Sequence, residues 1–145
     1  MKLENQVCSL KLAKKLRKLG VKQDSLWEWV ALPPQEDPPS KSDYILTLSF
    51  SKTLKAEKWC FSAFTVAELG GMLPVVIDLW GEEANIIISK GKFSKDYCID
   101  YLGNNKEIKK SDKNLSNALA KMLVYLLEVK LLKIKKGGKH GITQI

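Results

Sequence analysis

The sequence predicts a single α+β domain, with one antiparallel sheet of about five or six strands and helices mainly on one face of it. Three observations predict this class. Stretches with helical periodicity lie near both ends of the 145-residue chain, short alternating stretches lie between them, and the intervening turns are too short to hold crossover helices. Strands joined by such turns pair antiparallel. The predicted order of elements is α-β-β-β-α-β-β-β-α.

The first predicted element is a helix over residues 9–19, where apolar side chains recur at helical spacing. Ser9 is its expected N-cap, because a serine hydroxyl accepts a backbone N–H of the first turn. Gly20 is its expected end, because glycine adopts the left-handed conformation at little cost. A helix this short is not stable alone, so we expect its apolar stripe to dock on another element.

Strands are expected next, separated by a proline-rich connection. Trp27 and Trp29 alternate with other residues in a strand pattern and therefore share one face. Four prolines make residues 31–42 an extended loop, because proline lacks a backbone donor and has a fixed φ. The predicted strands cover residues 25–30, residues 43–51 and a short stretch around Trp59 to Ser62.

A short helix and a second group of strands follow. Thr65 and Glu68 have the spacing of a capping box at the start of a helix over residues 65–73, and Pro74 is expected to stop it. Gly81 is the expected turn of a β-hairpin. The strands of this second group are predicted at residues 75–80, 84–89 and 96–102.

The longest predicted helix covers residues 114–133, with Asp112 or Asn114 as its cap. Its leucine-rich surface extends around more of the circumference than a narrow stripe, which indicates broad contact with the sheet. Each fully buried leucine contributes roughly 1.5–3 kcal/mol, so this helix is expected to be the main anchor of the core. Residues 1–136 are predicted to form one domain, and residues 137–145 a flexible basic tail.

The composition narrows the class of protein. Hydrophobic residues make up 45% of the chain, which is enough to form one core without disulfides or structural metal ions. The three cysteines lack the paired spacing of a disulfide scaffold or a zinc site and fit a reducing compartment. The N-terminus has no signal-peptide core, and no apolar run approaches the ~20 residues of a membrane span. We therefore expect a cytoplasmic protein with no membrane association.

The charge is strongly positive and unevenly distributed. The formal net charge is +8, with cations concentrated near both ends and a mildly acidic middle. A basic surface raises the local concentration of polyanions. All but one of the 24 cationic residues are lysine, which an AT-rich genome also produces, and only Arg17 offers a guanidinium for bidentate phosphate contacts. The lysine excess is therefore either functional or compositional.

The residue pattern offers little support for catalysis or for cofactor binding. His140 is the only histidine and lies in the glycine-rich tail, where nothing would hold it against a substrate. Asp96, Cys98 and Asp100 share a strand pattern, but solvated charge is the simpler interpretation. Glycine-rich nucleotide-binding motifs are absent. No catalytic residue, metal ligand or cofactor is predicted.

Lysines and tryptophans are the candidate binding residues. Lysines on one side of the first helix would contact phosphates, or they form a solvated face. Two tryptophans in the first strand would stack on bases or on a partner if exposed, or they pack in the core. The candidate residues are Lys11, Lys14, Lys15, Lys18, Trp27, Trp29, Lys130 and Lys133.

Three segments together resemble a known family. They are CSLKLAKKLRKLGVKQDSLWEW near the start, FSAFTVAELGGMLP in the middle and ALAKMLVYLLEVKLL near the end. They are similar to segments of small uncharacterised proteins of bacteriophages, prophages and scattered bacterial genomes, which share an ELAKxLKxLG-type helix, a YSAPTxAELGxxLP-type segment and an AKMLIYLLE-type helix. Phe64 and Gly71 depart from that pattern. The resemblance implies no activity, because the family has none assigned.

Two functional hypotheses follow from different classes. The first is a non-enzymatic binding protein, a phage or mobile-element accessory that contacts a host macromolecule. The second is a nucleic-acid-binding protein that uses its lysine-rich helical face. A host protein and a nucleic acid are thus both candidate partners, and the oligomeric state is open.

Overall fold

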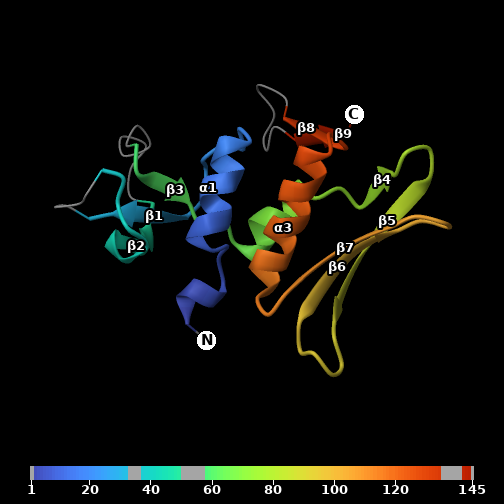
Figure 1. Cartoon of the computed structure of the whole chain (residues 1–145), viewed down its shortest axis with the longest axis horizontal. Coiled ribbons are helices and arrows are strands. Elements are labelled where there is room, and N and C mark those ends of the chain that lie inside the picture. Colours follow the sequence, from blue (N-terminus) through green and yellow to red (C-terminus); the bar gives the residue numbers. More distant parts are fainter. Residues whose placement is uncertain (1, 33–36, 50–57, 135–141, 145) are drawn as a thin grey trace.

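The computed structural model describes residues 2–32, 37–49, 58–134 and 142–144, and it confirms the α+β class (Figure 1). The helices are α1 (Leu10–Lys18), α2 (Val66–Met72) and α3 (Leu115–Glu128), with short 3-10 turns at η1 (Leu3–Asn5) and η2 (Lys41–Asp43). The strands are β1 (Trp27–Ala31), β2 (Tyr44–Leu48), β3 (Cys60–Ser62), β4 (Val76–Asp78), β5 (Glu83–Lys90), β6 (Tyr97–Leu102), β7 (Glu107–Asp112), β8 (Leu132–Ile134) and β9 (Ile142–Gln144).

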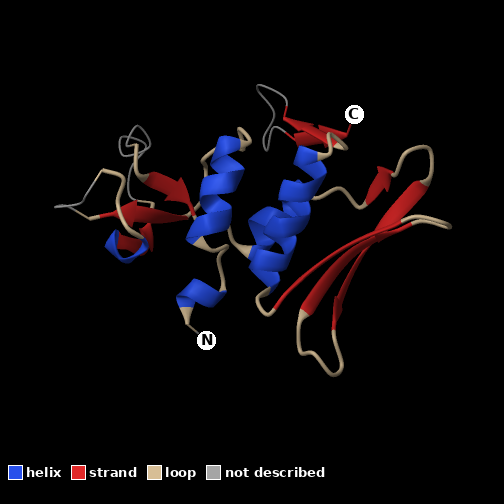
Figure 2. Cartoon of the chain, in the orientation of Figure 1, coloured by secondary structure: helices blue, strands red, loops and turns tan. Residues whose placement is uncertain are grey.

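The strands form two larger antiparallel sheets instead of the one that the sequence predicts. The first sheet has the order β2-β1-β3, the second has the order β4-β5-β6-β7, and β8 pairs with β9 separately. The helices lie between the two larger sheets as a middle layer (Figure 2). The prediction of helices on one face of a single sheet was therefore wrong.

The apolar surface of α3 explains the two-sheet arrangement. This helix contacts β6 and β7 of the second sheet, and it also contacts α1 and α2 on its other sides. The helix α1 in turn contacts β3 of the first sheet. A helix that is apolar around most of its circumference buries more than one side. The helices α1 and α3 together therefore separate the two sheets, with α1 on the first sheet and α3 on the second.

The last helix is shorter than predicted. It ends at Glu128, and Lys130 has a φ of +61°, which a continuous right-handed helix does not allow. The chain then turns into β8, which pairs with β9. Residues 142–144 of the predicted tail are thus paired in a strand, whereas residues 137–141, including His140, lie outside the described residues.

One strand of the second sheet was missed by sequence reasoning. The strand β7 has the sequence EIKKSD, in which Ile108 is the only apolar residue. It pairs along its length with β6, from Tyr97 opposite Asp112 to Leu102 opposite Glu107. Its place in the sheet depends on this ladder and on contact with α3, which no local pattern reveals.

The predicted starts and turns are largely confirmed. The Thr65 hydroxyl accepts the Glu68 N–H at 3.2 Å and the Glu68 carboxylate accepts the Thr65 N–H at 2.7 Å, as a capping box requires. Gly81 has a φ of +89° in the turn between β4 and β5. Ser9 is the N-cap residue of α1 but makes no side-chain cap. Its N–H donates to Asn117 Oδ1 at 2.8 Å and ties α1 to α3.

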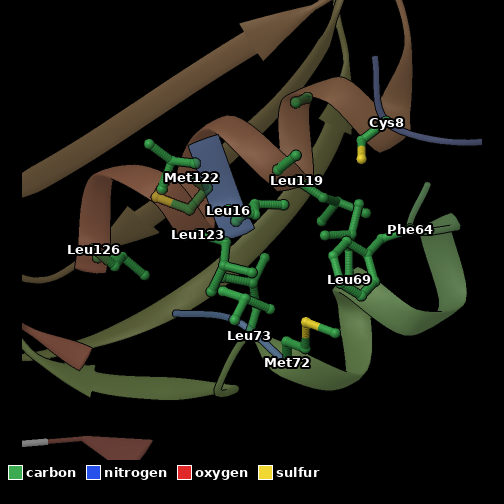
Figure 3. Close-up of a cluster of buried hydrophobic side chains, with 14 of the residues drawn as sticks. Cys8, Leu16, Phe64, Leu69, Met72, Leu73, Leu119, Met122, Leu123 and Leu126 are labelled. Carbon is green, nitrogen blue, oxygen red and sulfur yellow. The ribbon is translucent and has the colours of Figure 1, made fainter. Parts of the chain in front are cut away.

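The core is a single cluster formed where the three helices meet (Figure 3). Its largest fully buried side chains include Leu16 of α1, Leu69 of α2, and Leu119, Met122 and Leu123 of α3. The prediction that the last helix anchors the core is confirmed by this burial. Among the described residues, no helix combines the length and the apolar character needed to cross a membrane.

Candidate functional site

The lysines of α1 gather on the side of the helix that faces away from the core. Lys11, Lys15 and Lys18 are exposed, and Lys14 is half-buried. Together with Leu10 of the same helix and Lys41 of η2, they line an open hollow of about 590 Å³. We call this hollow the α1 groove. Five of the six described residues that line it are lysines and none is acidic, so its lining is uniformly positive.

One of the groove cations, Lys14, rests on two aromatic rings of the first sheet. The Lys14 Nζ lies 4.4 Å from the centre of the Tyr44 ring and 5.5 Å from that of Phe61. Such cation–π contacts contribute roughly 0.5–1 kcal/mol at exposed positions. They position the Lys14 ammonium, and no carboxylate among the described lining residues neutralises its charge.

The single arginine has a structural position. The Arg17 guanidinium donates to the Cys60 carbonyl at 2.7 Å and to the Lys58 carbonyl at 3.3 Å. Its Cζ also lies 5.0 Å from the centre of the Phe61 ring. These contacts link α1 to the start of β3, so the Arg17 side chain stabilises the fold.

A second hollow adjoins the α1 groove and mixes both charges. We call it the α1–α3 groove. It has a volume of about 500 Å³, lies between α1, α3 and β7, and shares Lys11 and Lys15 with the α1 groove. Its other charged lining residues are Lys110, Asp112, Lys121 and Glu128.

Ion pairs neutralise much of the α1–α3 groove. The Lys15 Nζ lies 2.8 Å from Glu128 Oε1, and the Lys121 Nζ lies 2.7 Å from Asp112 Oδ2. The Lys110 Nζ lies 4.0 Å from the centre of the Tyr125 ring. The α1–α3 groove thus carries two carboxylates in its own lining, whereas the described lining of the α1 groove carries none, so the α1 groove is the stronger anion site of the two.

The Asp112 carboxyl has a lowered pKa. Burial acts to raise this pKa, but a hydrogen bond from Lys121, the N–H of Asn114, the charge of Lys121 and the Asn117 amide together outweigh burial. The carboxylate therefore stays ionised and holds the Lys121 side chain at the edge of the α1–α3 groove.

The structure brings only part of the predicted site together. Lys11, Lys14, Lys15 and Lys18 meet in the α1 groove as expected. Lys130, in the turn after α3, and Lys133, in β8, are exposed, but neither lines the α1 groove or the α1–α3 groove. The expected extension of the patch to these two lysines is therefore absent from the described grooves.

The tryptophans of β1 do not form an open platform. Trp27 and Trp29 are both half-buried, and Trp29 packs against the core. The indole N–H of Trp29 donates to the Cys8 carbonyl at 3.0 Å, which links β1 to the segment before α1. Of the two interpretations left open by the sequence, core packing describes Trp29.

Some groove residues were missed from the sequence. Lys41 lies in a 3-10 turn within the predicted proline-rich loop, and Lys110 lies in a strand that was not predicted. No periodic signal connects these lysines with α1. Their contribution depends on long-range contacts.

The acidic strand positions carry no clear chemistry. The Asp100 Oδ1 lies 3.8 Å from the Lys109 Nζ, and burial raises the Asp100 pKa, with Lys109 opposing and Glu107 reinforcing the shift. In the described part of the chain, no group of three His, Cys, Asp or Glu side chains is arranged to hold a metal ion.

Comparison with known proteins adds no assignment. The chain matches no protein-family model, no curated protein and no solved structure. The resemblance to small bacteriophage and prophage proteins therefore stays a prediction, and the functional argument depends on the geometry of the grooves.

Proposed function

We propose that this protein is a non-enzymatic binding protein whose α1 groove binds the phosphate backbone of a nucleic acid. The observation that carries the proposal is the lining of this groove: five lysines from α1 and η2 surround it without a carboxylate among the described lining residues. Phosphate contacts from lysine supply most of the sequence-independent affinity for nucleic acids. A groove of this composition therefore favours a polyanion over a neutral or cationic ligand.

The type of cation predicts the kind of recognition. Lysine is a strongly hydrated point charge, whereas arginine reads guanine bidentately. The only arginine is bonded to the Cys60 and Lys58 carbonyls and does not line the groove. We therefore expect the protein to contact backbone and to discriminate little between base sequences.

This proposal specifies the partner within the wider expectation of a phage or mobile-element accessory that contacts a host macromolecule. Nucleic acid is the macromolecule that the groove favours. A host protein remains the other class of partner named from the sequence, and the described lining of the α1 groove does not favour it over nucleic acid.

Fluorescence anisotropy with labelled duplex DNA, single-stranded DNA and RNA of random sequence tests the proposal between ~50 and ~200 mM salt. We expect binding to at least one probe that weakens steeply with salt. The double reversal Lys11→Glu/Lys18→Glu is expected to weaken binding and to reduce the slope of log affinity against log salt by about two.

The matched control is Lys130→Glu/Lys133→Glu, which changes the net charge equally outside both grooves. This control is expected to retain most of the affinity and the salt slope. Equal losses in both variants would show that only net charge matters, and they would overturn the assignment of the groove. Absence of binding to all three probes would overturn the proposed function.

A further inference from the structure

The end of β5 leaves one backbone edge without a partner strand. The strand β4 pairs only with Glu83, Ala84 and Asn85 of β5, and the last bond on that side runs from the Ile86 N–H to the Val75 carbonyl at 2.9 Å. Within the described part of the chain, no backbone hydrogen bond reaches β5 on that side beyond Ile86, and residues 87–90 are all exposed. Figure 1 shows the β5–β6 hairpin extending beyond the short β4.

Alternation along β5 identifies the backbone groups that face this edge. The Glu82 carbonyl accepts the Leu79 N–H on the β4 side, as the Ile86 N–H donates there, whereas the Gly91 N–H donates to Asp96 at the start of β6. Even-numbered residues therefore direct their N–H and C=O groups toward the β4 side. The unpaired groups at the open edge belong to Ile88 and Lys90.

Exposed apolar side chains accompany the open edge. Ile88 is 53% exposed, Phe93 in the β5–β6 turn is 93% exposed, and Val75 just before β4 is 71% exposed. Natural sheets protect such edges with charged side chains, lysine especially, with proline or with a covering element. Lys90 is one such residue at this edge, whereas the run Ile86 to Ile88 contains no charged residue and no proline.

We propose that this edge pairs with the same edge of a second copy of the chain, joining two four-stranded sheets into one continuous antiparallel sheet. Charge complementarity favours a second copy in the antiparallel direction. The β5–β6 turn carries Lys92 and Lys95 beside Lys90, whereas the opposite end of the β4–β5 hairpin carries Asp78, Glu82 and Glu83. Antiparallel pairing places the basic end of each copy near the acidic end of the other.

The structure selects one register. Pairing of Ile88 with Ile88 would place Lys90 of the second copy opposite Ile86, where the Val75 carbonyl already bonds. Pairing of Lys90 with Lys90 would put like charges directly opposite, which is destabilising. The remaining register places Ile88 opposite Lys90 of the second copy and puts Ser89 on the two-fold axis.

This register also accounts for the exposed apolar residues. The lysine stem opposite Ile88 covers its side chain. The turn that carries Phe93 comes close to the place where β4 of the second copy begins, next to Val75. Phe93 of one copy and Val75 of the other, which are both exposed in a single copy, thus meet across the interface.

A disulfide at the axis tests the register. In a non-hydrogen-bonded antiparallel pair the two Cα atoms lie about 4.5 Å apart, within the range that a disulfide spans. In a Cys98→Ser background, which prevents pairing with the neighbouring Cys98 opposite Ser89, Ser89→Cys is expected to form a covalent dimer under mild oxidation. The control Ser111→Cys, two strands away on the same sheet, is expected to stay monomeric.

Sedimentation of the unmodified chain and of Ile88→Pro provides the second test. Proline at position 88 removes an edge-facing N–H without removing a bond to β6, and edge strands tolerate such a proline. We expect a dimer for the unmodified chain and a folded monomer for Ile88→Pro, with folding checked by circular dichroism. An unmodified chain that stays monomeric at ~100 µM, or equal cross-linking of Ser89→Cys and Ser111→Cys, would overturn the proposal. Neither outcome bears on the α1 groove.

Discussion

Lys15 of α1 and Glu128 at the end of α3 form an ion pair with an Nζ–Oε1 distance of 2.8 Å. The pair lies at the boundary between the two grooves, because Lys15 lines both of them and Glu128 lines only the α1–α3 groove. Glu128 therefore neutralises one of the five lysines on which phosphate binding would depend.

Glu128→Gln is accordingly expected to increase nucleic-acid affinity. Release of Lys15 from a half-exposed ion pair should strengthen binding by a factor of roughly 1.4 to 5, since such pairs contribute about 0.2–1 kcal/mol. Anisotropy titrations at fixed salt measure the change. Glu107→Gln, an exposed acid of β7 outside both grooves, is the control of equal charge change. Equal gains in both variants would contradict a local role for Glu128.

Arg17→Lys is expected to destabilise the protein without changing its salt slope. The substitution keeps the charge but loses the paired bonds to the Cys60 and Lys58 carbonyls. A loss of about 1–3 kcal/mol in the free energy of unfolding is expected, because the Cys60 carbonyl, whose bond to Arg17 is half-buried, loses a charged donor, whereas the exposed Lys58 carbonyl can bond to water instead. Denaturant titration measures this loss. A selective loss of nucleic-acid binding at unchanged stability would instead make Arg17 a contact residue.

Leu123→Ala is expected to be strongly destabilising. The Leu123 side chain is completely buried in the cluster where the helices meet. Truncation leaves a cavity and should cost roughly 2–5 kcal/mol. The control is Leu26→Ala, whose side chain is 70% exposed and which should stay within about 0.5 kcal/mol of the unmodified protein. Similar denaturation midpoints for the two variants would contradict α3 as the anchor of the core.

Acid sensitivity is expected to include a contribution from Asp112. Its folded pKa lies below the ordinary value of 3.8, so its ionised form stabilises the fold at neutral pH. This stabilisation is present above pH ~4 and is lost as the pH falls through the folded pKa. Asp112→Asn should therefore lower the melting temperature at pH 7, and its difference from the unmodified protein should shrink toward pH 2. A difference independent of pH would exclude ionisation as the cause.

Local features of the chain predicted most of the elements. The spacing of Thr65 and Glu68 identified the start of α2, and Gly81 identified the turn of the β4–β5 hairpin, because capping and left-handed turns depend on a few neighbouring residues. The four lysines of α1 were likewise found by helical periodicity alone. Elements without an apolar pattern, such as β7, were not found, because cross-strand bonding holds them in place.

The sequence by itself determined the α+β class, the amphipathic α1 with its lysine side, and the leucine-rich α3 that forms the core. Only the tertiary structure decided that the strands divide into two sheets and that Lys41 joins the α1 lysines around one hollow. It also decided that Arg17 is bonded to the backbone near β3 instead of being available to a ligand. The physical reason is the separation along the chain over which each kind of interaction acts. Periodicity and capping act over a few residues, whereas sheet partition and groove lining depend on contacts between residues far apart in the chain.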